Sequence, residues 1–142
     1  MNTETATISR RALAGLGGEA ILRLVLRLDA LVTGANGAVY LAAASVIDSS
    51  LGLSSTLLRP TGGFLLVFGA GVWYLSTGAT ISKPAVRALV AANAGWAAAS
   101  LLVVATGTFS PTTAGSVWIA FQAAAVALFA TVQVLALRRA AR

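Results

Sequence analysis

The stretch that decides the fold is Asp29–Ile47, DALVTGANGAVYLAAASVI, which is long and apolar enough to cross a bilayer as a helix. Its few polar residues recur at intervals of four, three and four, which places them on one helix face. These residues are Asp29, Thr33, Asn36 and Tyr40. The stretch therefore predicts a membrane span with one polar face.

Composition extends this prediction to the whole chain. The 142 residues are 58% hydrophobic and only 10% charged, with a mean hydropathy of +0.87. Soluble domains carry about 25% charged residues, so the chain is predicted to be an integral membrane protein, and its length suits one domain. The sequence has no cysteine and no histidine. Disulfides, thiolate metal sites and histidine ligands or general bases are thereby excluded.

Four spans are predicted, because a bilayer core of about 30 Å needs roughly 20 helical residues. Their approximate ranges are 29–47, 62–80, 85–106 and 112–137. Prolines 84 and 111 stand where spans three and four begin, a position that suits proline. The longest connection is 48–61, and the short ones predict antiparallel neighbours. The expected fold is an all-α, polytopic four-helix bundle.

Residues 1–28 are expected to precede the membrane domain, which covers 29–142. Residues 1–9 are predicted to be a cytoplasmic tail, and residues 10–28 an amphipathic helix at the membrane interface. Glu19 and Arg23 stand in the favourable order for an ion pair one helical turn apart. A cleaved signal peptide is the competing interpretation, and it is weaker because charged residues continue to position 29.

Basic residues predict the orientation. With the N-terminus inside, nine of the ten fall on the inner side, and only Arg59 falls outside. The nine are Arg10, Arg11, Arg23, Arg27, Lys83, Arg87, Arg138, Arg139 and Arg142. The positive-inside rule then places both termini in the cytoplasm of a multi-pass plasma (inner) membrane protein. The net charge of +6 is interpreted as this topology signal, and no nucleic-acid partner is expected.

Two features suggest a duplication and close helix packing. Residues 35–45 and 92–100 share an Ala-Asn pair, small residues, an aromatic, alanines and a serine. This similarity predicts two helical hairpins related by a parallel repeat. Small residues at intervals of four let helix backbones approach closely in lipid. The predicted packing residues are Gly34, Ala38, Ala42, Ala91, Gly95 and Ala99. Packing within the chain is favoured, while a homo-oligomer or a larger membrane complex stays open.

The polar residues predict one candidate pocket between spans one, three and four. Its members are Asp29, Thr33, Asn36, Tyr40, Asn93, Trp96, Ser100 and Gln122. Buried amides need partners, so Asn36 and Asn93 are expected to bond each other or backbone carbonyls, as structural contacts or as a binding site.

Other polar and aromatic residues have simpler interpretations. For Asp29 the favoured interpretation is an interfacial ion pair, with a proton or cation site as the alternative. Its expected partners are Arg27, Lys83 or Arg87. The indole of Trp118 is predicted to belong to the interfacial aromatic belt.

No catalytic constellation or phosphate-binding loop is present, so an enzyme is not expected, nor is a cofactor or metal. The order of spans and the segment Ser110–Trp118, SPTTAGSVW, resemble small four-helix membrane proteins of high-GC actinobacteria. This resemblance implies a fold and no activity. The expected function is a non-catalytic accessory or structural subunit, with membrane lipids and other membrane chains as partners. The alternative is a small-molecule, lipid or ion carrier that uses the polar pocket.

Overall fold

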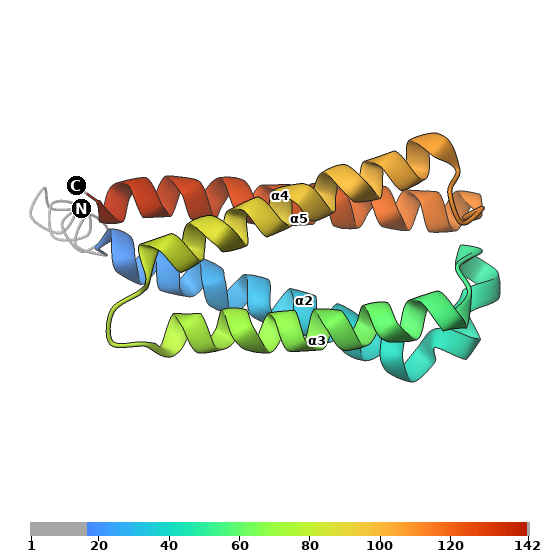
Figure 1. Cartoon of the computed structure of the whole chain (residues 1–142), viewed down its shortest axis with the longest axis horizontal. Coiled ribbons are helices and arrows are strands. Elements are labelled where there is room, and N and C mark those ends of the chain that lie inside the picture. Colours follow the sequence, from blue (N-terminus) through green and yellow to red (C-terminus); the bar gives the residue numbers. More distant parts are fainter. Residues whose placement is uncertain (1–16, 142) are drawn as a thin grey trace, which may run out of the picture.

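The computed structural model describes residues 17–141, and all regular structure within this range is helical. The helices are α2 (Gly18–Leu51), α3 (Ser55–Thr77), α4 (Lys83–Thr106) and α5 (Thr113–Ala140) (Figure 1). The predicted tail, the first part of the predicted interfacial helix, and Arg10, Arg11 and Arg142 lie outside the described residues. The all-α prediction is confirmed for the described range.

Three of these helices, α2, α4 and α5, are long and apolar enough to cross a membrane. This finding agrees with the predicted membrane class. Helix α3 has 23 residues, but Arg59 and Pro60 lie in its first two turns and lower its mean hydropathy. Large apolar side chains are exposed along the helices, including Val46 and Val67, each with 74% of its surface accessible. Such a surface suits contact with lipid better than contact with water.

Helix α2 is continuous across the predicted boundary at residues 28 and 29. Its 34 residues span about 51 Å at 1.5 Å per residue, well beyond a hydrocarbon core of about 30 Å. The predicted interfacial segment and span one are therefore parts of one helix from Gly18 onward. The predicted pair of Glu19 and Arg23 is confirmed, with 2.9 Å between the carboxylate and the guanidinium.

Helix α3 begins seven residues earlier than predicted. The hydroxyl of Ser54 accepts a hydrogen bond from the backbone N–H of Leu57 and caps the helix. Pro60 lies within the helix rather than before it. The predicted loop 48–61 is consequently reduced to residues 52–54, and Gly52 makes the turn with a φ of 67°.

The helices pack in pairs. Helix α2 lies along α3, helix α4 lies along α5, and the two pairs meet through α2 and α5 (Figure 1). In the first pair the backbones touch, because a Cβ added to Gly37 would lie 2.7 Å from the carbonyl oxygen of Gly62. Helices α2 and α5 approach closely at both ends, where Gly18 meets Ala140 and Gly115 meets Leu51. Between these end contacts the two helix pairs enclose the candidate site.

Of the six small residues that were predicted to pack within the chain, one lies at a close contact between helices and five do not. Gly34 is half-buried beside Gly69. The other five lie on exposed faces: Ala38, Ala42, Ala91, Gly95 and Ala99. The closest backbone contacts run instead through Gly37, Gly62 and Gly69, because α2 turns a different face toward α3.

Candidate functional site: two polar networks and an aromatic cavity

A buried carboxylate joins the two helix pairs. Asp29 of α2 has no accessible surface. The Thr33 hydroxyl donates to its Oδ1 at 3.0 Å. Its Oδ2 accepts from the amide nitrogens of Asn93 on α4, at 2.9 Å, and Gln133 on α5, at 2.7 Å. All three donors are neutral, so they satisfy the oxygen atoms without supplying a positive charge.

The predicted ion pair of Asp29 is wrong. Among residues 17–141 the ion pair found is that of Arg23 with Glu19. The guanidinium of Arg27 lies 5.7 Å from the ring centre of Trp73 on α3. Residues 27 and 29 are two apart, hence about 200° apart around a helix of 3.6 residues per turn, so they face different neighbours.

Arg23 also faces α3, where it binds the last turn of the helix. Its guanidinium donates to the carbonyl oxygen of Ser76 and, at 2.8 Å, to that of Gly78. Carbonyl groups at a helix C-terminus lack partners in the helix and carry partial negative charge. The arginine therefore caps α3 and is not available to Asp29.

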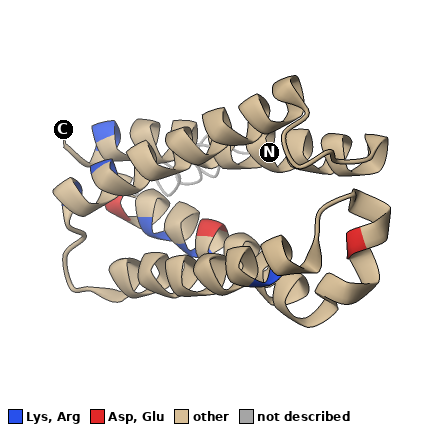
Figure 2. Ribbon diagram, turned by 45° about the vertical axis from the view of Figure 1, so that its right-hand side comes forward, with Lys and Arg blue, Asp and Glu red and all other residues tan. Residues whose placement is uncertain are grey.

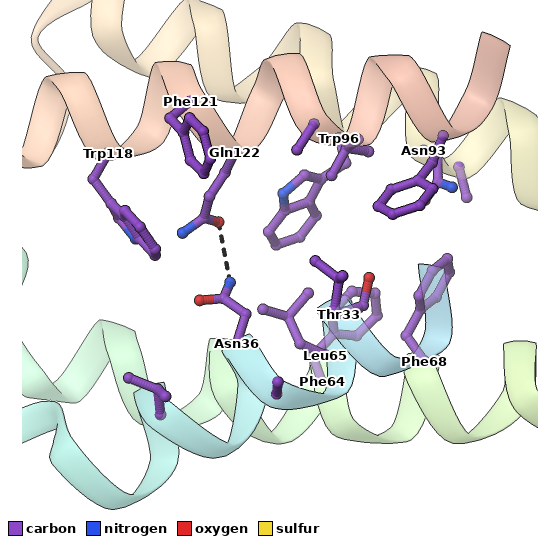
Figure 3. Close-up of a pocket in the computed structure, with 17 residues that line it drawn as sticks. Thr33, Asn36, Phe64, Leu65, Phe68, Asn93, Trp96, Trp118, Phe121 and Gln122 are labelled. Atoms are coloured by element: carbon purple, nitrogen blue, oxygen red, sulfur yellow. Dashed lines mark hydrogen bonds between the residues drawn. The ribbon is translucent and has the colours of Figure 1, made fainter. Parts of the chain in front are cut away.

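A second polar network lies farther along α2. The Asn36 amide donates to the side-chain oxygen of Gln122 on α5 at 3.1 Å (Figure 3). The Gln122 amide donates to the Tyr40 hydroxyl at 2.6 Å, and the Trp118 indole donates to the same hydroxyl at 2.8 Å. This network links α2 to α5 only.

The predicted single pocket is thus divided. Asn36 and Asn93 belong to different networks and do not bond each other. The predicted pocket did not include Gln133, although its spacing of eleven residues from Gln122 indicates that both lie on one face of the fourth span. It also assigned Trp118 to an interfacial belt, whereas the indole nitrogen has a partner inside the protein.

A cavity of about 410 Å³ lies between the two networks and is walled by all four helices (Figure 3). Its polar lining comes from Thr33, Asn36, Asn93 and Gln122. Six aromatic side chains also line it: Phe64, Phe68, Trp96, Trp118, Phe121 and Phe129. The rings of Phe64 and Trp96 stack with centres 5.7 Å apart and connect α3 to α4. The described residues that line the cavity include no charged side chain.

The cavity reaches the outer surface of the helices near the middle of α2. Val32, Val39 and Phe121 line it and are also 51%, 49% and 64% exposed. Ser100, a predicted member of the pocket, lines a smaller cavity of about 210 Å³ with Tyr40 and Trp96. The main cavity is thus the one that brings together polar groups, aromatic rings and an apolar opening.

Hydrogen-bond capacity remains at two amides of the main cavity. Asn36 and Asn93 both donate through their amide nitrogens. Within residues 17–141 no protein group donates a hydrogen bond to either side-chain oxygen. No buried polar side-chain atom lacks a partner in this range, so both oxygens keep some accessible surface. Because an amide oxygen can accept two hydrogen bonds, the cavity can offer acceptors to a bound molecule.

The fold and the site together define an all-helical chain with membrane-length helices and a ligand-sized aromatic cavity. Comparison of the chain with protein-family models, with curated proteins and with solved structures finds no match.

Proposed function

We propose that this protein is a four-span membrane protein that binds a small, mostly apolar molecule in the cavity between its helix pairs. The observation that carries the proposal is the cavity itself. Its volume of about 410 Å³ falls in the range of small-molecule sites, about 300–1,000 Å³. Such sites are mostly apolar and aromatic, with a few polar groups that orient the ligand, and the lining has this character.

The proposed membrane topology includes α3 as the fourth span of a helix bundle. Helix α3 packs along α2 and carries the apolar run FLLVF at residues 64–68. Basic residues gather toward the end that carries the C-terminus (Figure 2), and Arg59 lies near the start of α3, at the opposite end. This distribution supports termini in the cytoplasm of a plasma-membrane protein. The proposed duplication is supported by the lining, to which both repeats contribute an asparagine.

In this topology the opening of the cavity faces the bilayer. Residues 32–39 lie near the middle of α2, and the rim side chains Val32, Val39 and Phe121 are apolar. A ligand would enter from the lipid phase and place its polar atoms against the amides inside. The proposed activity is binding or carriage of an amphipathic small molecule, which corresponds to the carrier alternative above.

The experiment fills the cavity and compares the result with the same pair of substitutions made at neighbouring residues outside it. Ala92 and Ala125 line the cavity, whereas their neighbours Ala91 and Ala124 do not line it. The double variant A92F/A125F would occupy the cavity, and A91F/A124F is the matched control. Both are made with Trp73→Phe, so that the remaining fluorescence comes from Trp96 and Trp118.

The probe is 2-bromonaphthalene, whose bromine quenches indole fluorescence on contact. Saturable quenching is expected in phosphatidylcholine nanodiscs for the parent protein and for A91F/A124F. For A92F/A125F we expect only the weak, linear quenching that comes from probe dissolved in lipid. Equal saturable quenching in the two double variants would refute the proposal.

A second candidate function, an accessory subunit that self-associates or docks on a larger membrane complex, rests on a different observation. A Cβ added to Gly63, Gly71 or Gly95 would meet no atom within 4 Å. Together with exposed Ala38 and Ala99, these glycines form small-residue faces that do not pack closely against another helix of the chain. Co-purification in mild detergent tests this candidate, and a lone monodisperse monomer would count against it.

A further inference from the structure

We infer that the cavity selects a lipophilic organic cation, such as an aryl or alkyl ammonium, over neutral or anionic molecules of the same shape. This inference rests on the proposed function and specifies the ligand class of the same site. Three features of the cavity support it: a nearby negative charge, the electronic character of the lining and the shortage of polar groups.

The first feature is the carboxylate of Asp29, which lies directly behind the cavity wall. Thr33 and Asn93 contact this carboxylate through hydrogen bonds and also line the cavity. Among residues 17–141 no basic side chain lies within ion-pair distance of Asp29. When Asp29 is ionised, its negative charge has no cationic partner among the described residues, and it acts across a medium of low dielectric constant, where Coulomb interactions are strong.

The second feature is the lining, which attracts cations in two ways. Aromatic faces carry negative electrostatic potential, and ammonium groups bind over them. The stacked rings of Phe64 and Trp96 lie with the rings of Phe68 and Phe129 around the same space. The side-chain oxygen of Asn36 carries partial negative charge and can accept a hydrogen bond from an N–H group of the ligand.

The third feature distinguishes an organic cation from an inorganic one. A sodium or calcium ion needs about six oxygen ligands, and the cavity wall is mostly apolar, with four polar side chains that come from α2, α4 and α5. An inorganic ion would lose its hydration without replacement. An organic cation brings its own apolar surface, which the aromatic wall can cover.

The test uses three probes that share a naphthalene ring. They are trimethyl(2-naphthyl)ammonium, its uncharged isostere 2-tert-butylnaphthalene, and the anion 2-naphthalenesulfonate. Each displaces 2-bromonaphthalene from the Trp73→Phe protein in phosphatidylcholine nanodiscs, so that the membrane carries no net charge. We expect the ammonium to bind about tenfold or more tightly than the isostere, and the sulfonate to bind most weakly.

The variant Asp29→Asn keeps the shape of the side chain and removes its charge. The ratio of the two dissociation constants, isostere to ammonium, should fall several-fold from about ten in this variant, and the smaller preference that remains is the one that the aromatic faces supply. Retention of the wild-type ratio in folded D29N protein would overturn the role of Asp29. If D29N does not fold, the wild-type ranking still decides, because an isostere that binds as well as the ammonium overturns the inference.

The two proposals fail in different ways. Saturable binding of the uncharged probes without preference for the ammonium would refute the inference and leave the proposed function in place. Absence of saturable binding by 2-bromonaphthalene and by all three competitors would refute the proposed function, and the inference with it.

Discussion

Replacing Gln133 with leucine tests whether the Asp29 network holds the two helix pairs together. The amide of Gln133 donates to Asp29 at 2.7 Å, and both side chains are fully buried. A hydrogen bond to a charged group contributes about 1.5–3 kcal/mol in proteins, while bonds between membrane helices average nearer 0.6 and reach about 1.7. Since the acceptor is a carboxylate without a cationic partner, we expect Q133L to lower the free energy of unfolding by about 2 kcal/mol.

The assay is reversible unfolding in mixed micelles of mild detergent and dodecyl sulfate, followed by circular dichroism. Thr131→Val is the matched control, because the Thr131 hydroxyl is exposed and bonds its own helix at the carbonyl of Ala127. We expect T131V to change stability by less than about 0.5 kcal/mol.

A double-mutant cycle identifies the cause. In a D29N background the acceptor is neutral, so the cost of Q133L should fall to about 1 kcal/mol or less. If Q133L lowers the free energy of unfolding equally with aspartate and with asparagine at position 29, the charge of the carboxylate is not what makes the Gln133 donor important. If Q133L costs no more than T131V, the network does not stabilise the fold.

Four further variants test three separate contacts. Gly62→Ala should destabilise the protein by about 1–3 kcal/mol, because its new Cβ would meet the backbone of α2. At Gly63 a new Cβ would project into open space, so Gly63→Ala should instead stabilise α3 by up to about 1 kcal/mol. If Gly62→Ala and Gly63→Ala changed the free energy of unfolding equally in the same assay, the backbone contact at Gly62 would be contradicted. Arg23→Gln should speed hydrogen exchange in the last turn of α3, whose carbonyl groups Arg23 binds, and unchanged exchange there would argue against the cap. Trp118→Phe removes a donor to the Tyr40 hydroxyl and should cost about 1 kcal/mol, so a variant as stable as the parent would argue against the interior role of this indole.

Much of the helical plan could be predicted because apolar length and proline position encode it directly. Helix α4 begins at Lys83 with Pro84 in its first turn, close to the predicted residue 85. The start of α3 was missed because residues 48–61, which include Pro60, were assigned to the connection between spans one and two. Pro60 lies inside α3, where it removes one backbone hydrogen bond of the helix, and the Ser54 cap sets the actual start.

Several polar residues that line the cavity were among the predicted ones, but their hydrogen-bond partners were not predicted. The spacing of the polar residues between Asp29 and Tyr40 indicated which side chains share a face of α2. The partners of Asp29 depend on how α4 and α5 are rotated about their own axes, and the sequence of α2 contains no information on that rotation. Arg27 looked available because it is near in sequence, whereas it faces α3.

The cavity could not be predicted from any stretch of sequence. It arises because α2 and α5 touch at Gly18 and Ala140 and again at Leu51 and Gly115. Between these contacts aromatic side chains line the space without filling it. Such a space depends on the relative placement of four helices, which are distant in sequence.

The depth and accessibility of Trp96 test most directly the central claim of a cavity that opens to the bilayer. Trp96 lines the cavity and becomes the lone fluorophore when Trp73 and Trp118 are replaced by phenylalanine. In nanodiscs that contain brominated lipids, we predict stronger quenching by bromine at mid-chain than by bromine near the headgroup, with little quenching by aqueous iodide. Strong quenching by iodide, or none by mid-chain bromine, would contradict the claim.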